Sequence, residues 1–298
     1  MSDRDTAALI ALLRQDDHPW GHIAEAVEDA GSAVRVLEGG VDAARQGDGL
    51  QLFEAPSREV DLAPIVEEIK AWRTEGFSVL SILDEDYPRN LRMIHNRPPI
   101  IFVRGGLTED DSNSVAVVGA RKASPEGLAA AKAMAEGIAE VGYTVVSGLA
   151  AGVDSAAHTA ALHRGARTVA VIGTGIRRFY PPANEELQKT IAERGAVLSQ
   201  FWPDAPPSKK SFPMRNAVMS GFALATVVIE ATNTSGARMQ ARLALEHNRP
   251  VFLHRRLLVH QWARECAERP GAHVIDGADQ VLGRIERLTD VGELALSI

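Results

Sequence analysis

The chain has 298 residues, of which 45% are hydrophobic and 24% charged, and these proportions are ordinary for a globular protein. No apolar run approaches the roughly 20 residues that a membrane-spanning helix needs, and the first 17 residues are too acidic for a signal peptide, so we expect a cytoplasmic protein with no membrane partner. The only cysteine, Cys266, excludes an intrachain disulfide and cannot by itself build a metal site.

The net charge of −7 is unevenly distributed along the chain. The first 60 residues hold 12 acidic and 5 basic residues, whereas the remaining 238 residues hold 27 of each. Because nucleic-acid binding depends on a local cationic patch rather than on bulk charge, the larger part of the chain could still carry such a face.

Residues 1–75 are predicted to form a small N-terminal helical domain. Apolar residues recur at helical spacing in 6–14, 23–30 and 60–72, and glycines interrupt the pattern at 39–40 and 47–49. Trp20 and Trp72 are expected to pack between these helices. This region shows no residues with an evident chemical role.

A strand is expected at 77–83, followed by a helical stretch that ends at His95 and a second strand at 100–103. Pro98 and Pro99 prevent a helix from running into that strand. We interpret this segment as an extension that covers one edge of the main sheet.

From Val115 onward, apolar strands alternate with amphipathic helical segments. The predicted strands begin near Val115, Thr144, Thr168, Ala196, Thr226, Pro250 and His273. This alternation predicts an α/β fold with a Rossmann-like, doubly wound, mostly parallel sheet. We assign it to a domain at 76–298, with the sheet core at about 110–290.

The turn after the first of these strands contains Gly119, Arg121, Lys122 and Ser124. The carboxyl ends of parallel strands are where open α/β sheets bind ligands, and amides at a helix start together with Arg121 could hold an anion. An equally supported interpretation is a tight turn in which Ser124 caps a helix that begins at Pro125.

Two further glycine-rich turns follow the next two strands. Ser147 and Gly148 open the first, which leads to Asp154 and His158; these could act as base and acid, but a helix cap and a structural histidine are the favoured interpretations. The second contains Gly173 and Gly175. Two basic residues, Arg177 and Arg178, follow it and are expected to share a rim with the other turns.

The remaining candidates lie before and after the strand near Thr226. Lys209, Lys210, Phe212, Arg215 and Asn216 precede it, and lysines beside an aromatic ring suit a single-stranded nucleic acid, whose phosphates need cations and whose bases need a stacking partner. Phe212 could instead pack under the loop. Ser235 and Gly236 start another helix, which is a further site suited to anions.

Taken in order, these motifs resemble those of the DprA/Smf DNA-processing family. The matching stretches are 84–91, 119–124, 145–158, 173–184, 212–216 and 230–236, within a similarity covering about residues 76–255. The resemblance implies a Rossmann-like core that binds single-stranded DNA, acts as a homodimer and hands the strand to the RecA recombinase in DNA recombination, uptake or protection. It implies no catalytic residue, no metal and no cofactor.

The chain also departs from the family pattern. Ala151 and Ala217 stand where the family often has arginine, and the chain ends without the winged-helix extension that many members carry. Each lost phosphate contact is expected to weaken DNA binding and its dependence on salt. Arg177, Arg178 and Arg238 are expected to compensate.

We therefore predict a single-stranded DNA-binding site made of the turn residues and cations above. Its members are Gly119, Arg121, Lys122, Ser124, Ser147, Gly148, Gly173, Gly175, Arg177, Arg178, Lys209, Lys210, Phe212, Arg215, Asn216, Ser235 and Gly236. Two alternatives stay open: a nucleotide-sensing regulatory subunit of a toxin-antitoxin or phage-defence pair, with the toxin as its partner, and a LOG-like nucleotide phosphoribohydrolase that uses Glu230 or Asp154.

Overall fold

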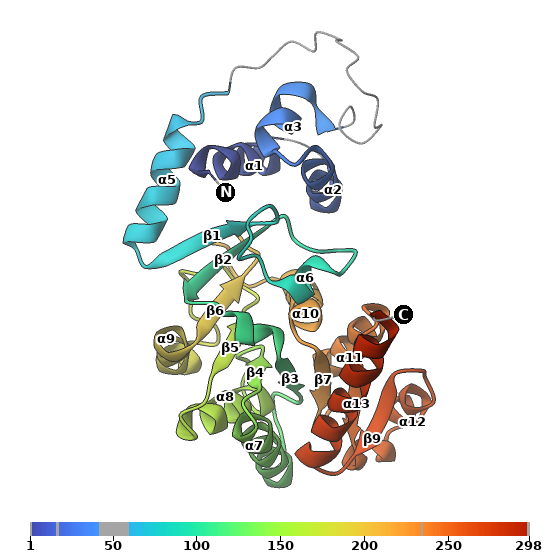
Figure 1. The fold of residues 1–298 in the computed structure, drawn as a ribbon. Coiled ribbons are helices and arrows are strands. Elements are labelled where there is room, and N and C mark those ends of the chain that lie inside the picture. Colours follow the sequence, from blue (N-terminus) through green and yellow to red (C-terminus); the bar gives the residue numbers. More distant parts are fainter. Residues whose placement is uncertain (1, 16–17, 42–59, 234, 297–298) are drawn as a thin grey trace.

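The computed structural model describes residues 2–15, 18–41, 60–233 and 235–296, with side chains up to residue 288. The glycines predicted to interrupt the chain at 47–49 lie outside these residues. Figure 1 shows one central sheet with helices on both faces and a group of helices beyond its β1 edge.

Within this part of the chain, nine strands form a single sheet in the order β1-β2-β6-β5-β4-β3-β7-β8-β9. The strands are β1 Phe77–Ser81, β2 Ile100–Gly105, β3 Ser114–Val118, β4 Thr144–Ser147, β5 Thr168–Val171, β6 Ala196–Ser199, β7 Ala225–Val228, β8 Val251–His254 and β9 Ala272–Ile275. Strands β3 to β9 pair in parallel, and β2 joins β6 antiparallel and carries β1 at the edge. The predicted α/β fold is confirmed, and every predicted strand of the parallel part starts within one residue of the observed one.

The strand order reverses between β3 and β7. Successive strands from β3 to β6 add on one side, and β7 to β9 add on the other, so the sheet is doubly wound. Val118 pairs with Val228 at the last position of each strand. The loops that follow these two strands therefore start side by side, at the edge where such folds bind ligands.

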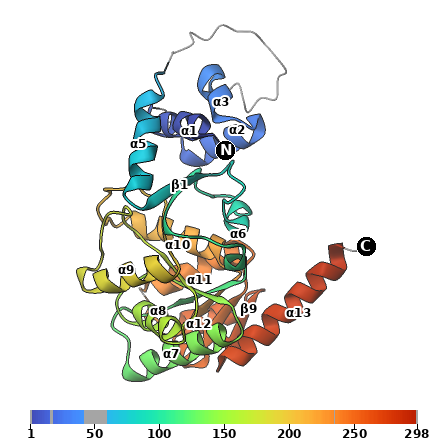
Figure 2. The same ribbon diagram turned by 60° about the vertical axis from the view of Figure 1, so that its left-hand side comes forward.

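Helices cover both faces of the sheet because the strands are apolar on both sides. One face is covered by α7 Pro125–Glu140, α8 Val153–His163, α9 Glu185–Arg194 and α13 Ala278–Leu296, and the other by α10 Ser211–Phe222, α11 Gly236–Glu246, α12 Gln261–Ala267 and the short α6 Arg89–Arg92. Figure 2 shows α13 running past the sheet to the C-terminus.

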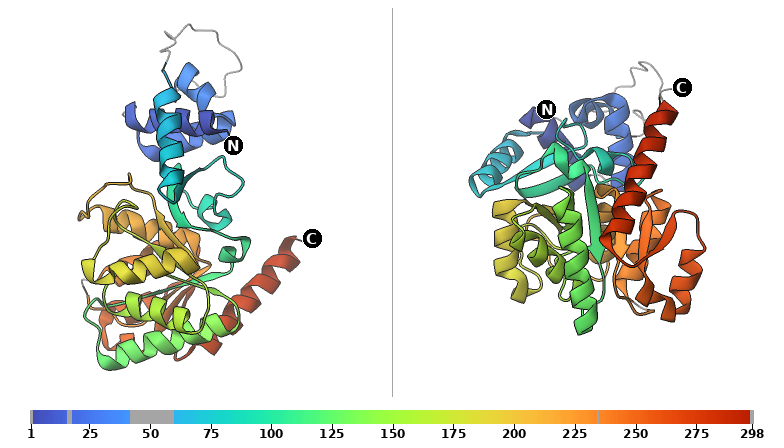
Figure 3. Two further views of the ribbon diagram at one scale, coloured as in Figure 1. Left: turned by 90° about the vertical axis from the view of Figure 1, so that its left-hand side faces the viewer. Right: turned by 60° about the horizontal axis from the view of Figure 1, so that its bottom comes forward.

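The N-terminal helices α1 Asp3–Gln15, α2 Trp20–Ala30, α3 Ala33–Gly39 and α5 Ala63–Thr74 lie beyond β1, as both views in Figure 3 show. They do not have a core of their own, because their buried residues form one cluster with those of β1, β2, β5 and β6. Trp72 of α5 packs against Phe77 and Phe102, with ring centroids 6.2 and 5.2 Å apart. The short helix α3 was not among the predicted helices.

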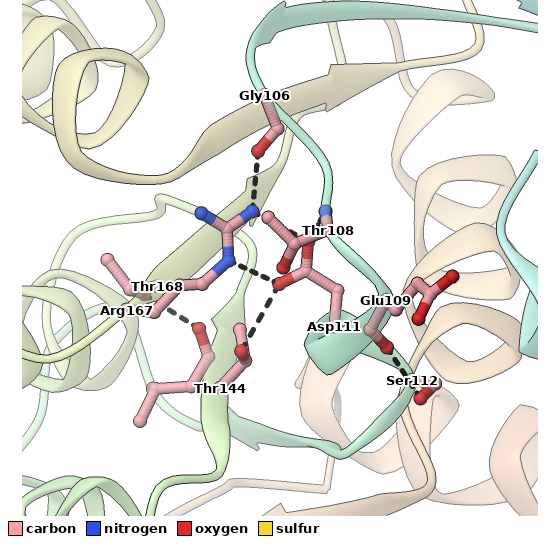
Figure 4. A network of polar contacts seen from close by, with 9 residues as sticks. Gly106, Thr108, Glu109, Asp111, Ser112, Thr144, Arg167 and Thr168 are labelled. Carbon is pink, nitrogen blue, oxygen red and sulfur yellow. Dashed lines mark hydrogen bonds and ion pairs between the residues drawn. The ribbon is translucent and has the colours of Figure 1, made fainter. Parts of the chain in front are cut away.

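A polar network holds the edge of the sheet that is opposite to the ligand-binding edge (Figure 4). Asp111 is almost fully buried and accepts two hydrogen bonds from Arg167, at 2.6 and 2.7 Å, and one from the Thr144 hydroxyl at 3.2 Å. Arg167 also donates to the Gly106 carbonyl. These contacts join the β2–β3 connection to the starts of β4 and β5.

None of the described helices has the length and hydropathy that crossing a bilayer requires.

Candidate nucleic-acid interface

A pocket of about 530 Å³ lies where the loops after β3 and β7 meet. Its walls come from these loops, from the first turn of α11 and from α10. The lining residues include Gly119, Arg121, Lys122, Asp154, Phe212, Arg215, Asn216, Ser235 and Gly236. Eight of the predicted site residues line the pocket, and two of them, Arg121 and Arg215, place their guanidinium groups near the Phe212 ring. The pocket lies at the switch point of the sheet.

Two exposed cations stand at the mouth of this pocket. Arg121 and Lys122 form no ion pair and no hydrogen bond within the described residues. The Arg121 guanidinium lies over the Phe212 ring, 5.0 Å from its centroid. The ring face attracts the cation and fixes its position, while the N–H groups of the guanidinium stay available to an anion.

A third cation, Arg215, lies at the base of the pocket and is only 6% exposed. Its Nε donates to the Asn216 side chain at 3.0 Å, and its Nη1 donates to the carbonyls of Gly148 and Val171. Its Nη2 donates to no described group. Arg215 is thus held by the backbone of two strand ends, with one N–H edge left for a ligand.

Asp154 is the buried counterpart of Arg215. Burial raises the pKa of the Asp154 carboxyl and lowers the pKa of the Arg215 guanidinium, and the charge of each opposes the shift of the other. The Ala150 amide donates to Asp154 at 3.3 Å. These contacts position the turn after β4, where Gly148 must lack a side chain because a Cβ atom would lie 2.0 Å from Nη1 of Arg215.

The start of α7, which the sequence offered as an anion site, is already bound by a carboxylate of the chain. Ser124 caps the helix by accepting a hydrogen bond from the Gly127 amide at 3.0 Å. Its own amide and hydroxyl donate to Glu230, at 3.0 and 2.5 Å. The cap interpretation therefore holds for Ser124, and Glu230 occupies the place that a phosphate would take.

Two polar residues near the pocket belong to the core. Ser147 is fully buried and donates to the Val117 carbonyl at 2.6 Å, which joins β4 to β3. His158 is fully buried, with its Nδ1 2.7 Å from the Thr168 hydroxyl, and burial lowers its pKa to about 3. His158 is therefore neutral at physiological pH and has the structural role that the sequence favoured.

The two glycines after β5 have different surroundings. A Cβ atom at Gly173 would lie 2.9 Å from the Phe212 ring, so this glycine lets Phe212 pack closely beside the pocket. At Gly175 a Cβ atom would meet the carbonyls of Trp202 and Pro203 at 2.2 Å. Gly175 is required for loop packing and does not line the pocket.

Four of the predicted cations lie outside the pocket lining. Arg177 binds Glu75 and Asp204, with nitrogen to oxygen distances of 2.7 and 2.6 Å, and these bonds raise its pKa further above the usual value. Arg178 is exposed and donates to the Asp204 carbonyl at 3.1 Å. Lys209 and Lys210 are exposed immediately before α10. Arg177 thus forms ion pairs with two carboxylates, whereas the two lysines have no partner among the described residues.

The start of α11 remains open to the pocket. Ser235 caps this helix by accepting from the Ala237 amide at 3.2 Å, and the Asn216 side chain donates to the Gly236 carbonyl at 3.2 Å. No atom lies within 4 Å of where a Cβ of Gly236 would be. An anion in the pocket would meet the positive end of α11 beside Arg121 and Lys122.

Sequence reasoning did not identify two features of the site. The electrostatic interaction between the buried residues Asp154 and Arg215 joins positions 61 apart in the sequence, and only the fold brings them together. Tyr180, whose ring centroid lies 5.8 Å from that of Phe212, belonged to a recognised motif but had no assigned role. Its Tyr-Pro pair within that motif was the sequence signal that could have identified it.

Comparison with known proteins places these features in a family context. Residues 78–286 match the model of the family described as DNA recombination-mediator protein A. DNA processing protein DprA of Streptococcus pneumoniae is 37% identical over 214 residues, which are 71% of this chain and 76% of that protein. Protein Smf of Synechocystis is 35% identical over 217 residues, which are 72% of this chain and 54% of the relative.

Solved structures agree with these sequence matches. The X-ray structure of DprA from Streptococcus pneumoniae superposes with a TM-score of 0.67 at 30% identity and covers 95% of this chain and 93% of that one. DprA from Helicobacter pylori, studied for its mode of binding single-stranded DNA, superposes with a TM-score of 0.62 at 27% identity and covers 72% and 96%.

Proposed function

Because the chain belongs to the DNA recombination-mediator protein A family, we propose that it is a DNA-processing protein that binds single-stranded DNA in the pocket between β3 and β7. The observation that carries the proposal is that Arg121 and Lys122 are exposed and have no ion-pair partner in the described part of the chain. They stand at the mouth of a pocket whose base holds a guanidinium edge of Arg215. The relative from Helicobacter pylori was studied for this same kind of binding.

Phosphate binding in this pocket follows from its geometry. Arg121 and Lys122 can each neutralise one phosphate, and the start of α11 adds partial positive charge from the helix dipole. Because none of these groups reads a base edge, the contacts are independent of sequence. Of the remaining predicted cations, Arg178, Lys209 and Lys210 would extend the contact along the strand, whereas Arg177 is bound to Glu75 and Asp204.

The finer parts of the proposal are its partners and setting. We propose that the protein acts as a homodimer in the cytoplasm and passes the strand to a RecA recombinase, without catalysing a reaction itself. Sedimentation of the full chain, alone and with RecA on a DNA oligomer, tests both partners. A monomer, or a complex on DNA that excludes RecA, would contradict them.

The two alternatives are not favoured by the comparisons, whose relatives are DNA-processing proteins. The two carboxylates that the hydrolase alternative would use are both held by contacts within the protein. Glu230 accepts hydrogen bonds from Ser124, and Asp154 is buried among backbone amides beside Arg215.

Fluorescence anisotropy with a labelled dT oligomer tests the proposed function. Arg121→Ala should weaken binding at low salt and reduce the slope of log affinity against log salt by about 0.7, the value for one phosphate contact on a single strand. Lys132→Ala on α7 is the matched control, since it removes one exposed cation outside the pocket and should leave that slope unchanged. Absence of binding by the unmodified chain, or equal behaviour of both variants, would refute the proposal.

A further inference from the structure

The ring of Tyr180 stands at the side of the pocket beside Phe212 and is 38% exposed. We propose, on the basis of the proposed function, that Tyr180 is a base-stacking residue. It would receive the nucleobase next to the phosphate that Arg121 holds.

Tyr180 is part of the same site as the phosphate-binding cations. A second, smaller recess is lined by Tyr180, Gly173 and Phe212, and it shares Arg121 and Arg215 with the main pocket. A strand whose phosphate lies at Arg121 therefore has an exposed aromatic face within reach of its base. Cations that bind phosphates next to rings that stack on bases are the arrangement that single-stranded DNA requires.

The two neighbouring rings differ in what they contact. Phe212 is half-buried, with the Arg121 and Arg215 guanidinium carbons 5.0 and 6.0 Å from its centroid and the Gly173 backbone packed against it. Its ring helps to position two cations. The Tyr180 ring lies tilted by 42° against the Phe212 ring and is more exposed, which leaves surface for a ligand.

The loop that carries Tyr180 is held in place by its neighbours. The Asn184 side chain donates to the Leu149 carbonyl at 2.9 Å, and the Gln188 side chain donates to the Arg178 carbonyl at 3.1 Å. These bonds anchor the loop on both sides of Tyr180 to the turn after β4 and to α9. A ring that is already positioned loses little conformational entropy when a base stacks on it.

The same loop supplies a matched control. Phe179 precedes Tyr180 and is also 38% exposed, but it lies against Lys189, whose Nζ is 5.5 Å from the ring centroid, and it does not line either recess. Equal exposure of two adjacent rings, only one of them in the site, allows a stacking effect to be separated from a general effect of removing an aromatic surface.

The test measures the affinity of the full chain for a labelled dT oligomer and for an abasic oligomer of equal length, which keeps the phosphates and lacks the bases. Tyr180→Ala should bind dT roughly tenfold more weakly than the unmodified chain, whereas Tyr180→Phe and Phe179→Ala should stay within about twofold. On the abasic oligomer, the unmodified chain and Tyr180→Ala should bind equally. The salt slope of Tyr180→Ala should be unchanged, because no phosphate contact is lost.

Three outcomes would overturn the inference. Unchanged dT affinity in Tyr180→Ala, or an equal loss on both oligomers, would show that the ring does not stack on bases while leaving phosphate binding intact. Loss of affinity in Tyr180→Phe would assign the effect to the hydroxyl. Failure of the unmodified chain to bind either oligomer would instead refute the proposed function on which the inference rests.

Discussion

The Glu230 carboxylate accepts hydrogen bonds from both the amide and the hydroxyl of Ser124, at 3.0 and 2.5 Å. These bonds connect Glu230, which lies two residues after the end of strand β7, with the cap of α7, across the point where the strand order reverses. They also fill the helix end that lies beside the pocket. We therefore expect an anion to bind on the side of the pocket formed by Arg121, Lys122 and the start of α11.

The coupling between Ser124 and Glu230 should be measurable in a double-mutant cycle. Ser124→Ala removes the cap of α7 and should lower the free energy of unfolding by about 1 kcal/mol. Glu230→Ala leaves the Ser124 amide without its acceptor and should have a similar effect. Because both changes remove the hydrogen bond from the Ser124 hydroxyl to Glu230, the double variant should lose about 1 kcal/mol less than the sum in urea unfolding. Additive losses would show that the two residues stabilise the fold independently.

Gly148→Ala should disturb the base of the pocket. The added methyl group would lie 2.0 Å from Nη1 of Arg215 and 2.8 Å from Oδ2 of Asp154. Arg215 is buried and bonded to two backbone carbonyls, so it can move only by breaking those bonds. We expect a loss of about 2 kcal/mol in the free energy of unfolding and weaker binding of a labelled dT oligomer.

The control for this variant is Gly236→Ala, also in the pocket lining. A Cβ atom there would meet nothing within 4 Å, so the protein should keep its stability to within about 0.5 kcal/mol. Equal stability of Gly148→Ala and Gly236→Ala would contradict the tight packing of Arg215 against the turn after β4.

Two buried histidines should make the fold sensitive to acid. Burial lowers the pKa of His158 to about 3 and that of His247 to about 4. Between these values and about 6.5 the unfolded chain binds protons that the folded chain does not. The stabilisation is therefore complete above about pH 6.5 and is lost as the pH falls, by up to about 1.4 kcal/mol per pH unit for each group.

Urea unfolding at pH 7.5, 6.5 and 5.5 measures this dependence. His247→Gln should reduce the slope of unfolding free energy against pH by the contribution of one histidine. Burial raises the pKa of Asp154, so that residue contributes a slope of opposite sign. This contribution is common to all the variants and cancels when they are compared. His163→Gln, an exposed residue at the end of α8, is the control and should follow the parent protein. Parallel slopes for all three proteins would contradict the burial of a neutral His247.

Much of the fold could be predicted from local pattern. The parallel strands are short apolar runs such as 115–118 and 144–147, buried on both faces, and the segments between them have helical spacing. Both the apolar runs of the strands and the helical spacing between them arise because the strands and one face of each helix are buried in the core. Helix α3 was missed because a seven-residue helix between two turns shows too few repeats of the apolar pattern.

The site was predicted in outline, because the carboxyl ends of parallel strands meet at one edge. Gly119 and Arg121 after β3, and Ser235 and Gly236 after β7, do line one pocket. The sequence could not show that Ser124 is bound by Glu230, 106 positions later, or that Ser147 is turned into the core. The assignment of DNA contacts to these residues stays a prediction.

The sequence alone determined the doubly wound sheet, its ligand-binding edge and the family resemblance, since each depends on apolar periodicity and short local motifs. Only the tertiary structure decided which cations are available to a ligand. Arg121, Arg177 and Arg215 were all predicted as DNA-binding cations. Within the described residues, however, Arg121 is exposed and has no ion-pair partner, Arg177 is bound to Glu75 and Asp204, and Arg215 is buried. The reason is physical. Whether the charge of an arginine is available to a ligand depends on the burial of its side chain and on ion-pair partners that lie far away in the chain. Neither can be read from the residues next to it.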